Sequence, residues 1–121
     1  MNPVNCFEIP ARDLGRAKSF YEKVFDVELK AMEMGSSKMA MFPGGPGAEN
    51  ASGCLMKGEG YEPSHSGSVV YFHVKNIDQT LNKIKAAGGS TLMPNTSIGE
   101  NGFMAQFQDS EGNRVALHSM G

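Results

Sequence analysis

The sequence predicts an α+β fold built from two copies of one βαβββ unit. An apolar segment with strand character at residues 4–9 is followed by a polar helix start at Asp13, and the same order recurs at 69–74 and Asn76. Asp13 and Asn76 both suit a helix N-cap, and they stand about half the chain length apart. Such a repeat indicates two supersecondary units that bury their apolar faces together.

Length and composition fit one globular domain. The chain has 121 residues, of which 40% are hydrophobic and 20% charged, values that are usual for globular proteins. A chain of this size buries about two-thirds of its unfolded surface, enough for one core. We expect a single domain over 1–121, with the first repeat at about 1–60 and the second at about 67–121.

Charge and hydropathy exclude several classes of partner. The net charge of −2 gives no attraction to nucleic acid or to an anionic membrane. No apolar run reaches the ~20 residues that span a bilayer, and the first residues lack the basic and apolar regions of a signal peptide. Two cysteines do not make a disulfide framework. We therefore expect a cytoplasmic protein.

The first half reads as strand, helix and three strands. Alternating apolar residues predict a strand at 4–9, and helical spacing predicts a helix from about 14 to 25. A hairpin at 27–33 and 38–42 is expected to turn at Gly35, and a short strand follows at 53–57. The expected buried positions of the helix are Leu14, Ala17, Tyr21 and Val24.

The second half repeats this order. Its expected elements are a strand at 68–74, a helix at 77–87, and strands near 90–93, 103–108 and 114–119. The helix should end at Gly88-Gly89, because a left-handed residue is favoured there. Its expected buried positions are Ile77, Leu81 and Ile84.

The order of short motifs resembles the glyoxalase/bleomycin resistance protein/extradiol dioxygenase superfamily, also called the vicinal oxygen chelate superfamily. The resemblance covers nearly the whole chain. It rests on Phe7-Glu8-Ile9-Pro10, Asp13-Leu14, Ala17, Phe20-Tyr21, Val24-Phe25, Val74-Lys75-Asn76-Ile77, Ala87-Gly88-Gly89 and Asp109-Ser110-Glu111-Gly112-Asn113. The chain departs from the pattern at Asp26, where the family usually has glycine.

This resemblance implies a fold and a type of site. Two βαβββ units form a curved mixed sheet around a cavity, and short members are usually homodimers. Many enzymes of the superfamily hold a divalent metal with four side chains, mainly His and Glu. Substrate oxygens bind that metal, which stabilises an enolate or activates dioxygen.

At the metal positions that the resemblance implies, this sequence has few side chains that can bind a metal. They correspond to Cys6, Val69 and Ala116, and to one residue on the strand near 53–56, where Cys54 and Met56 are among the candidates. A catalytic metal needs about three protein donors, and the side chains of Val69 and Ala116 have none. We therefore expect neither the family's metal nor any other cofactor.

Because side chains two residues apart on a strand point the same way, each of these positions identifies further residues on the same face of its strand. If Cys6, Val69 and Ala116 face the cavity, so do their neighbours two residues away. We expect the cavity to be lined by Cys6, Cys54, Met56, Val69, Tyr71, Arg114 and Ala116. The candidates for acid–base catalysis on the same face are Glu8, His73 and His118.

These residue types leave several roles open. A carboxylate in an apolar strand, such as Glu8, needs a partner or a hydrated cavity, and a carboxylate beside a histidine can transfer protons near neutral pH. Glu8, His73 and His118 could instead be relocated metal ligands. The histidines could also simply lie at strand ends in solvent.

The sequence hypothesis is a protein that binds a small molecule between its βαβββ units without the family's metal site, and that forms a homodimer. Three alternatives stay open: a metal-dependent lyase, isomerase or dioxygenase with relocated ligands, an antibiotic-sequestering protein, and an interaction module whose cavity has closed. The sequence names no ligand and leaves open whether the chain is an enzyme.

Overall fold

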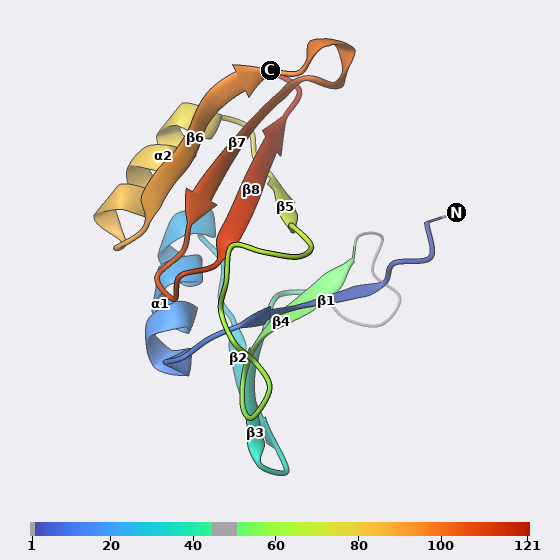
Figure 1. Ribbon diagram of the computed structural model, residues 1–121, viewed down its shortest axis with the longest axis vertical. Coiled ribbons are helices and arrows are strands. Elements are labelled where there is room, and N and C mark those ends of the chain that lie inside the picture. The colour runs from blue at the N-terminus through green and yellow to red at the C-terminus, as the bar shows by residue number, and fades with distance from the viewer. Residues whose placement is uncertain (1, 45–50) are drawn as a thin grey trace.

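The computed structural model describes residues 2–44 and 51–121. Each half contains one strand, one helix and three further strands, as the repeat predicted (Figure 1). The first half has β1 (Cys6–Pro10), α1 (Leu14–Phe25), β2 (Lys30–Met34), β3 (Ser37–Met41) and β4 (Ser52–Lys57). The second has β5 (Tyr71–His73), α2 (Ile77–Ala86), β6 (Ser90–Ser97), the 3-10 turn η1 (Gly99–Asn101), β7 (Phe103–Gln108) and β8 (Arg114–Ser119). The predicted α+β class is confirmed.

Each half forms its own mixed four-stranded sheet. The strand orders are β1-β4-β3-β2 and β5-β8-β7-β6, so that the two sheets have the same topology. In each sheet the first strand pairs in parallel with the last one, and the remaining pairs are antiparallel. Both helices lie on the left in Figure 1, with the sheets to their right.

The helices begin where the sequence predicted. The Asp13 side chain accepts a hydrogen bond from the Arg16 N–H, and the Asn76 side chain accepts one from the Gln79 N–H. At the end of α1, Asp26 takes the left-handed conformation with φ 54°. Glycine adopts this conformation without steric cost. The left-handed turn therefore explains why the superfamily that the sequence resembles usually has glycine where this chain has Asp26.

The two units share one apolar core between their helix-bearing faces. The buried faces of α1 and α2, which hold Tyr21 and Ile84, belong to a single cluster with Phe107 of β7 and Leu117 of β8. Phe72 from β5 stacks on Phe25 from α1, with ring centroids 4.5 Å apart. The units are therefore packed together within one chain through the faces that carry the helices.

Polar contacts between α1 and the turn after β7 reinforce this packing. The Tyr21 hydroxyl donates to Asp109 Oδ2 at 2.7 Å, and both residues are buried. The Glu111 carboxylate accepts hydrogen bonds from the backbone N–H groups of Arg12 and Asp13, and it also pairs with the Arg16 guanidinium at 2.8 Å. The turn between β7 and β8 thus holds the first helix of the other unit.

Several strand boundaries differ from the sequence prediction. The hairpin begins at Lys30 rather than 27, because the Val27 and Leu29 N–H groups bond to Glu22 of α1 instead of a neighbouring strand. β6 runs on to Ser97 through Pro94, with two register shifts against β7. A proline is compatible with this edge strand, where one side of the backbone needs no partner. β5 is shorter than predicted.

Candidate functional site

The helix-free face of the first sheet carries Glu8. On β1, Cys6 and Glu8 are exposed on this face, while Phe7 and Ile9 pack into the core on the other. Glu8 lies opposite Cys54 in the register of β1 and β4. The Tyr61 hydroxyl donates to Glu8 Oε1 at 3.2 Å, so the carboxylate has one protein partner as well as solvent.

Sulfur atoms dominate the rest of this face. Cys54, Met39 and Met56 form a buried cluster, against which Met41 and Tyr61 pack. Burial, followed by the nearby charges of Glu8 and Cys6, raises the pKa of the Cys54 thiol to about 11. The thiol is therefore protonated at neutral pH. Since the thiolate is the form that attacks electrophiles and binds metals, Cys54 is a weak nucleophile and a weak ligand.

The helix-free face of the second sheet carries both predicted histidines. Tyr71 and His73 are exposed, while Phe72 between them packs into the core. Tyr71 lies opposite Ala116, and His73 lies opposite His118. On β8, Ala116 is fully buried, and His118 is half-buried. The alternation that the sequence predicted for both strands is present.

The structure brings the two histidines together but does not join Glu8 to them. His73 Nδ1 lies 3.4 Å from His118 Nδ1. Within residues 2–44 and 51–121, the hydrogen bond of the Glu8 side chain is to Tyr61 rather than to either histidine. Tyr61 was missed in the sequence, because it lies in a Gly/Pro-rich segment where no periodicity assigns a direction to its side chain.

A groove of about 760 Å³ lies between the edge strands β1 and β5. Three of the predicted site residues line it: Val69 and Tyr71, which were expected to line the cavity, and His73, a candidate for catalysis. Most of its other lining is aliphatic or aromatic and comes from Val4, Phe7, Val27, Phe42, Pro43, Ala51, Val70 and Phe72. An apolar cleft of this volume with a few polar groups is typical of small-molecule sites.

Two further predicted residues share a smaller pocket. Glu8 and Arg114 line a space of about 230 Å³, together with Ser64, Ser66 and Ser68 of the connection between the units. The Arg114 Nε atom is buried and has no hydrogen-bond partner in the described part of the chain. This pocket therefore contains charges of both signs, separate from the apolar groove.

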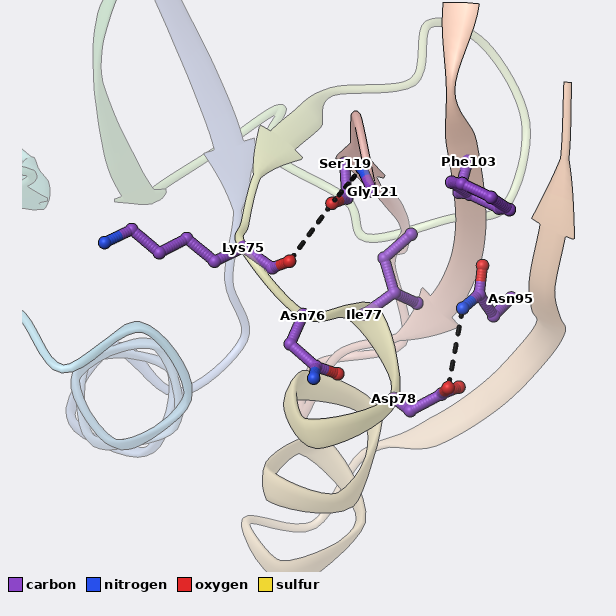
Figure 2. Close-up of a pocket in the computed structure, with 8 residues that line it drawn as sticks. All are labelled: Lys75, Asn76, Ile77, Asp78, Asn95, Phe103, Ser119 and Gly121. Carbon is purple, nitrogen blue, oxygen red and sulfur yellow. Dashed lines mark hydrogen bonds between the residues drawn. The ribbon is translucent and has the colours of Figure 1, made fainter. Parts of the chain in front are cut away.

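Another pocket, of about 180 Å³, lies beside the start of α2 and contains none of the predicted site residues (Figure 2). Two hydrogen bonds join groups that line this pocket. Asn95 donates to Asp78 at 3.5 Å, and the Ser119 hydroxyl donates to the Lys75 carbonyl at 3.2 Å.

In the part of the chain that the structure describes, no helix is long and apolar enough to cross a membrane. The same residues contain no group of three or more His, Cys, Asp or Glu side chains placed to hold a metal ion.

Comparison with known protein families and with individual proteins gives matches over nearly the whole chain. The sequence model described as the Glyoxalase/Bleomycin resistance protein/Dioxygenase superfamily matches residues 4–117. A glyoxylase-like domain-containing protein of Didymella fabae is 31% identical over 118 residues, covering 94% of this chain and 91% of that protein.

Solved structures of similar fold include proteins with different activities. The antibiotic-binding protein TnmS3 from Streptomyces sp. CB03234 has a TM-score of 0.72 at 20% identity, covering 98% of this chain and 96% of its own. The fosfomycin resistance protein FosX from Listeria monocytogenes has a TM-score of 0.70 at 19% identity, covering 98% and 93%. Glyoxalase I from Zea mays has a TM-score of 0.73 at 20% identity, covering 95% of this chain and 45% of that one. The chain therefore spans about half the length of the maize enzyme.

Proposed function

Because the chain belongs to the glyoxalase/bleomycin resistance protein/dioxygenase superfamily, we propose that it binds a small, largely apolar molecule in the groove between β1 and β5. One observation carries the proposal. Residues 69–73 of the second unit and Phe7, Val27 and Phe42 of the first line the same apolar groove. Its volume of about 760 Å³ lies within the range of roughly 300–1,000 Å³ that is usual for ligand pockets.

The residues at the superfamily's metal positions do not fit a divalent ion. Val69 and Ala116 offer hydrocarbon only, and Ala116 is fully buried. The thiol of Cys54, the best donor on β4, has a raised pKa because it is buried. A metal at this position would have Cys6 as its only readily available ligand, whereas a catalytic ion needs about three. We therefore propose binding without the superfamily's metal.

Binding is better supported than catalysis. General acid–base chemistry needs the two groups within hydrogen-bond reach of the same substrate atom. Glu8, on the first sheet, bonds to the Tyr61 hydroxyl. His73 and His118, on the second sheet, bond to each other instead of to Glu8. The antibiotic-binding protein among the structural relatives favours sequestration of an apolar compound as the second candidate function.

Titration with a fluorescent apolar probe, 8-anilinonaphthalene-1-sulfonate, followed by competition with a panel of aromatic compounds, tests the proposal. All steps are run in EDTA. Tyr71→Ala should weaken binding of the probe and of any competitor by about tenfold, because it removes an aromatic wall worth about 1–2 kcal/mol. Phe103→Ala is the matched control, because Phe103 is another exposed aromatic residue and lines the pocket beside α2 instead. Equal effects of the two substitutions would reject the groove.

We also propose that the chain is a homodimer. The helix-bearing faces share the core, while Glu8, Tyr71 and His73 on the helix-free faces of β1 and β5 are exposed. One chain therefore leaves these faces open, and a second copy would enclose them. Light scattering should give twice the 13.0 kDa of one chain. A mass equal to one chain at micromolar concentration would exclude the dimer.

A cytoplasmic location is proposed from the cysteines. Cys6 is exposed and Cys54 buried, and both are free thiols. Free thiols persist where the compartment is reducing. Fractionation of cells that express the full protein, with the thiols trapped by alkylation, should find it in the cytosol with both cysteines reduced.

A further inference from the structure

Arg114, at the start of β8, has a buried donor without an acceptor. Its Nε atom is buried and makes no hydrogen bond within residues 2–44 and 51–121, which contain no other such buried side-chain atom. The guanidinium is always charged in proteins. A buried donor of a charged group costs free energy unless an acceptor meets it. The position therefore requires an acceptor that the described residues do not supply.

The contacts around Arg114 explain why this donor is left over. Its cross-strand neighbour on β7 is Gln108. The side-chain oxygen of Gln108 accepts a hydrogen bond from His65 Nε2 at 2.8 Å. The backbone N–H of Arg114 donates to the Ser64 carbonyl at 3.1 Å. The segment 64–68 therefore lies beside the start of β8, and its contacts take the acceptor nearest to Arg114 across the strands.

The pocket of about 230 Å³ lies at this contact between segment 64–68 and β8. The charged and hydroxyl side chains that line it are one cation, two carboxylates and three serines: Arg114, Glu8, Glu62, Ser64, Ser66 and Ser68. Neither carboxylate is bonded to Arg114. Glu8 accepts from the Tyr61 hydroxyl, and Glu62 lies 4.0 Å from the Arg12 guanidinium. The pocket therefore holds opposite charges that do not neutralise each other directly.

This charge pattern selects the class of ligand. A simple anion would pair with Arg114 but would be repelled by the two carboxylates, and a simple cation would leave the buried donor unmet. A molecule with one carboxylate and one ammonium group satisfies both sides. The volume of about 230 Å³ is below the roughly 300–1,000 Å³ of ordinary ligand pockets, so the molecule must be small.

We propose that this pocket binds a small zwitterion of the α-amino acid class, at a site separate from the apolar groove. The ligand's carboxylate accepts charge-assisted hydrogen bonds from the Arg114 guanidinium, and the serine hydroxyls offer further donors. Its ammonium group is attracted to Glu8 and Glu62. Because Glu8 belongs to the first βαβββ unit and Arg114 to the second, the bound zwitterion bridges the two units.

The experiment is an NMR titration of the full ¹⁵N-labelled chain with L-alanine, observed at the Arg114 Nε–H signal. The signal should shift and saturate, because the carboxylate of alanine becomes the missing acceptor. Acetate and ethylammonium each carry only one of the two charged groups. Each should bind at least about tenfold more weakly than alanine, since a hydrogen bond to a charged group is worth about a factor of ten or more.

Substitutions separate the two halves of the site. Arg114→Gln should weaken alanine binding by at least about tenfold, as measured at the backbone signals of residues 64–68. Glu8→Gln should weaken the binding of alanine but not that of acetate, because it removes attraction for the ammonium group alone. Lys57→Gln and Glu59→Gln are the matched controls, since they make the same charge changes at exposed residues that do not line the pocket.

Several results would overturn the proposal. They are an Arg114 Nε–H signal that alanine does not move, acetate binding as tight as that of alanine, or equal losses in Arg114→Gln and Lys57→Gln. A second copy of the chain that itself supplied the acceptor would give the first of these results. The comparison of the three compounds on wild-type protein involves no substitution, so it holds even if a variant fails to fold. Alanine and the apolar probe are titrated separately, so failure of this site leaves the proposed groove standing.

Discussion

Replacing Tyr21 by Phe should destabilise the whole chain, because one hydroxyl links the two βαβββ units. Tyr21 is completely buried on α1 of the first unit. Its hydroxyl donates at 2.7 Å to Asp109, which belongs to the turn between β7 and β8 of the second. The other contacts of that carboxylate come from the N–H groups of Glu111 and Asn113 and from the Asn113 side-chain amide, all of them donors.

The expected loss of stability follows from the charge of the hydrogen-bond partner, the Asp109 carboxylate. A hydrogen bond to a charged group contributes about 1.5–3 kcal/mol. The carboxylate keeps its three remaining donors after the substitution, so we expect a loss near the lower half of that range, about 2 kcal/mol. At a denaturant slope of about 2 kcal/mol/M, the urea midpoint falls by about 1 M, and the slope itself stays unchanged.

Equilibrium unfolding in urea, followed by far-ultraviolet circular dichroism, measures this loss. Tyr61→Phe is the control. It removes the same atom from a tyrosine whose hydroxyl bonds to the exposed Glu8 at 3.2 Å, where water can replace it, so its cost should stay below about 0.5 kcal/mol. If Tyr21→Phe cost no more than the control, the two units would not be coupled through this contact.

Three further predictions follow from local features. Asp26→Gly should be more stable than Asp26→Ala by about 1 kcal/mol in urea unfolding, because φ at this position is 54° and only glycine avoids the steric cost. Although burial opposes ionisation of Glu111, bonds from Arg16 and the Asp13 N–H hold its pKa below the usual 4.5. Its contribution to stability is therefore present above pH 4.5 and lost as pH falls through the lower folded value, and Glu111→Gln should flatten that part of the acid-unfolding curve. Protein that is purified without added metal and desalted should carry well under one equivalent of Zn, Ni, Mn or Fe by mass spectrometry, and EDTA should not change its melting temperature. Stoichiometric retained metal would contradict the proposal that the chain binds its ligand without the superfamily's metal.

Local patterns in the sequence predicted much of the architecture. Asp13 and Asn76 start the two helices because cap chemistry acts within a few residues. The resemblance placed Cys6 and Val69 on the cavity face, and the alternation along β1 and β5 then placed Glu8, Tyr71 and His73 on the same face, because side chains two residues apart on a strand point the same way.

Contacts between distant segments could not be predicted in the same way. The strand start at Lys30 depends on Glu22 bonding to the Leu29 N–H, which is a contact across the end of a helix. The separation of Glu8 from the histidines depends on how two units pack. No periodicity within either unit encodes that arrangement, so the sequence alone placed Glu8, His73 and His118 on one face and left open whether they lie together.

The location of the ligand groove is the central claim, and a two-dimensional NMR titration of the labelled chain with 8-anilinonaphthalene-1-sulfonate in EDTA tests it most directly. The account predicts that backbone signals of Phe7, Val27 and residues 69–73 shift together and saturate with one dissociation constant. Saturable shifts centred instead on Ile77, Asp78, Asn95 and Phe103, the residues of the pocket in Figure 2, would contradict it.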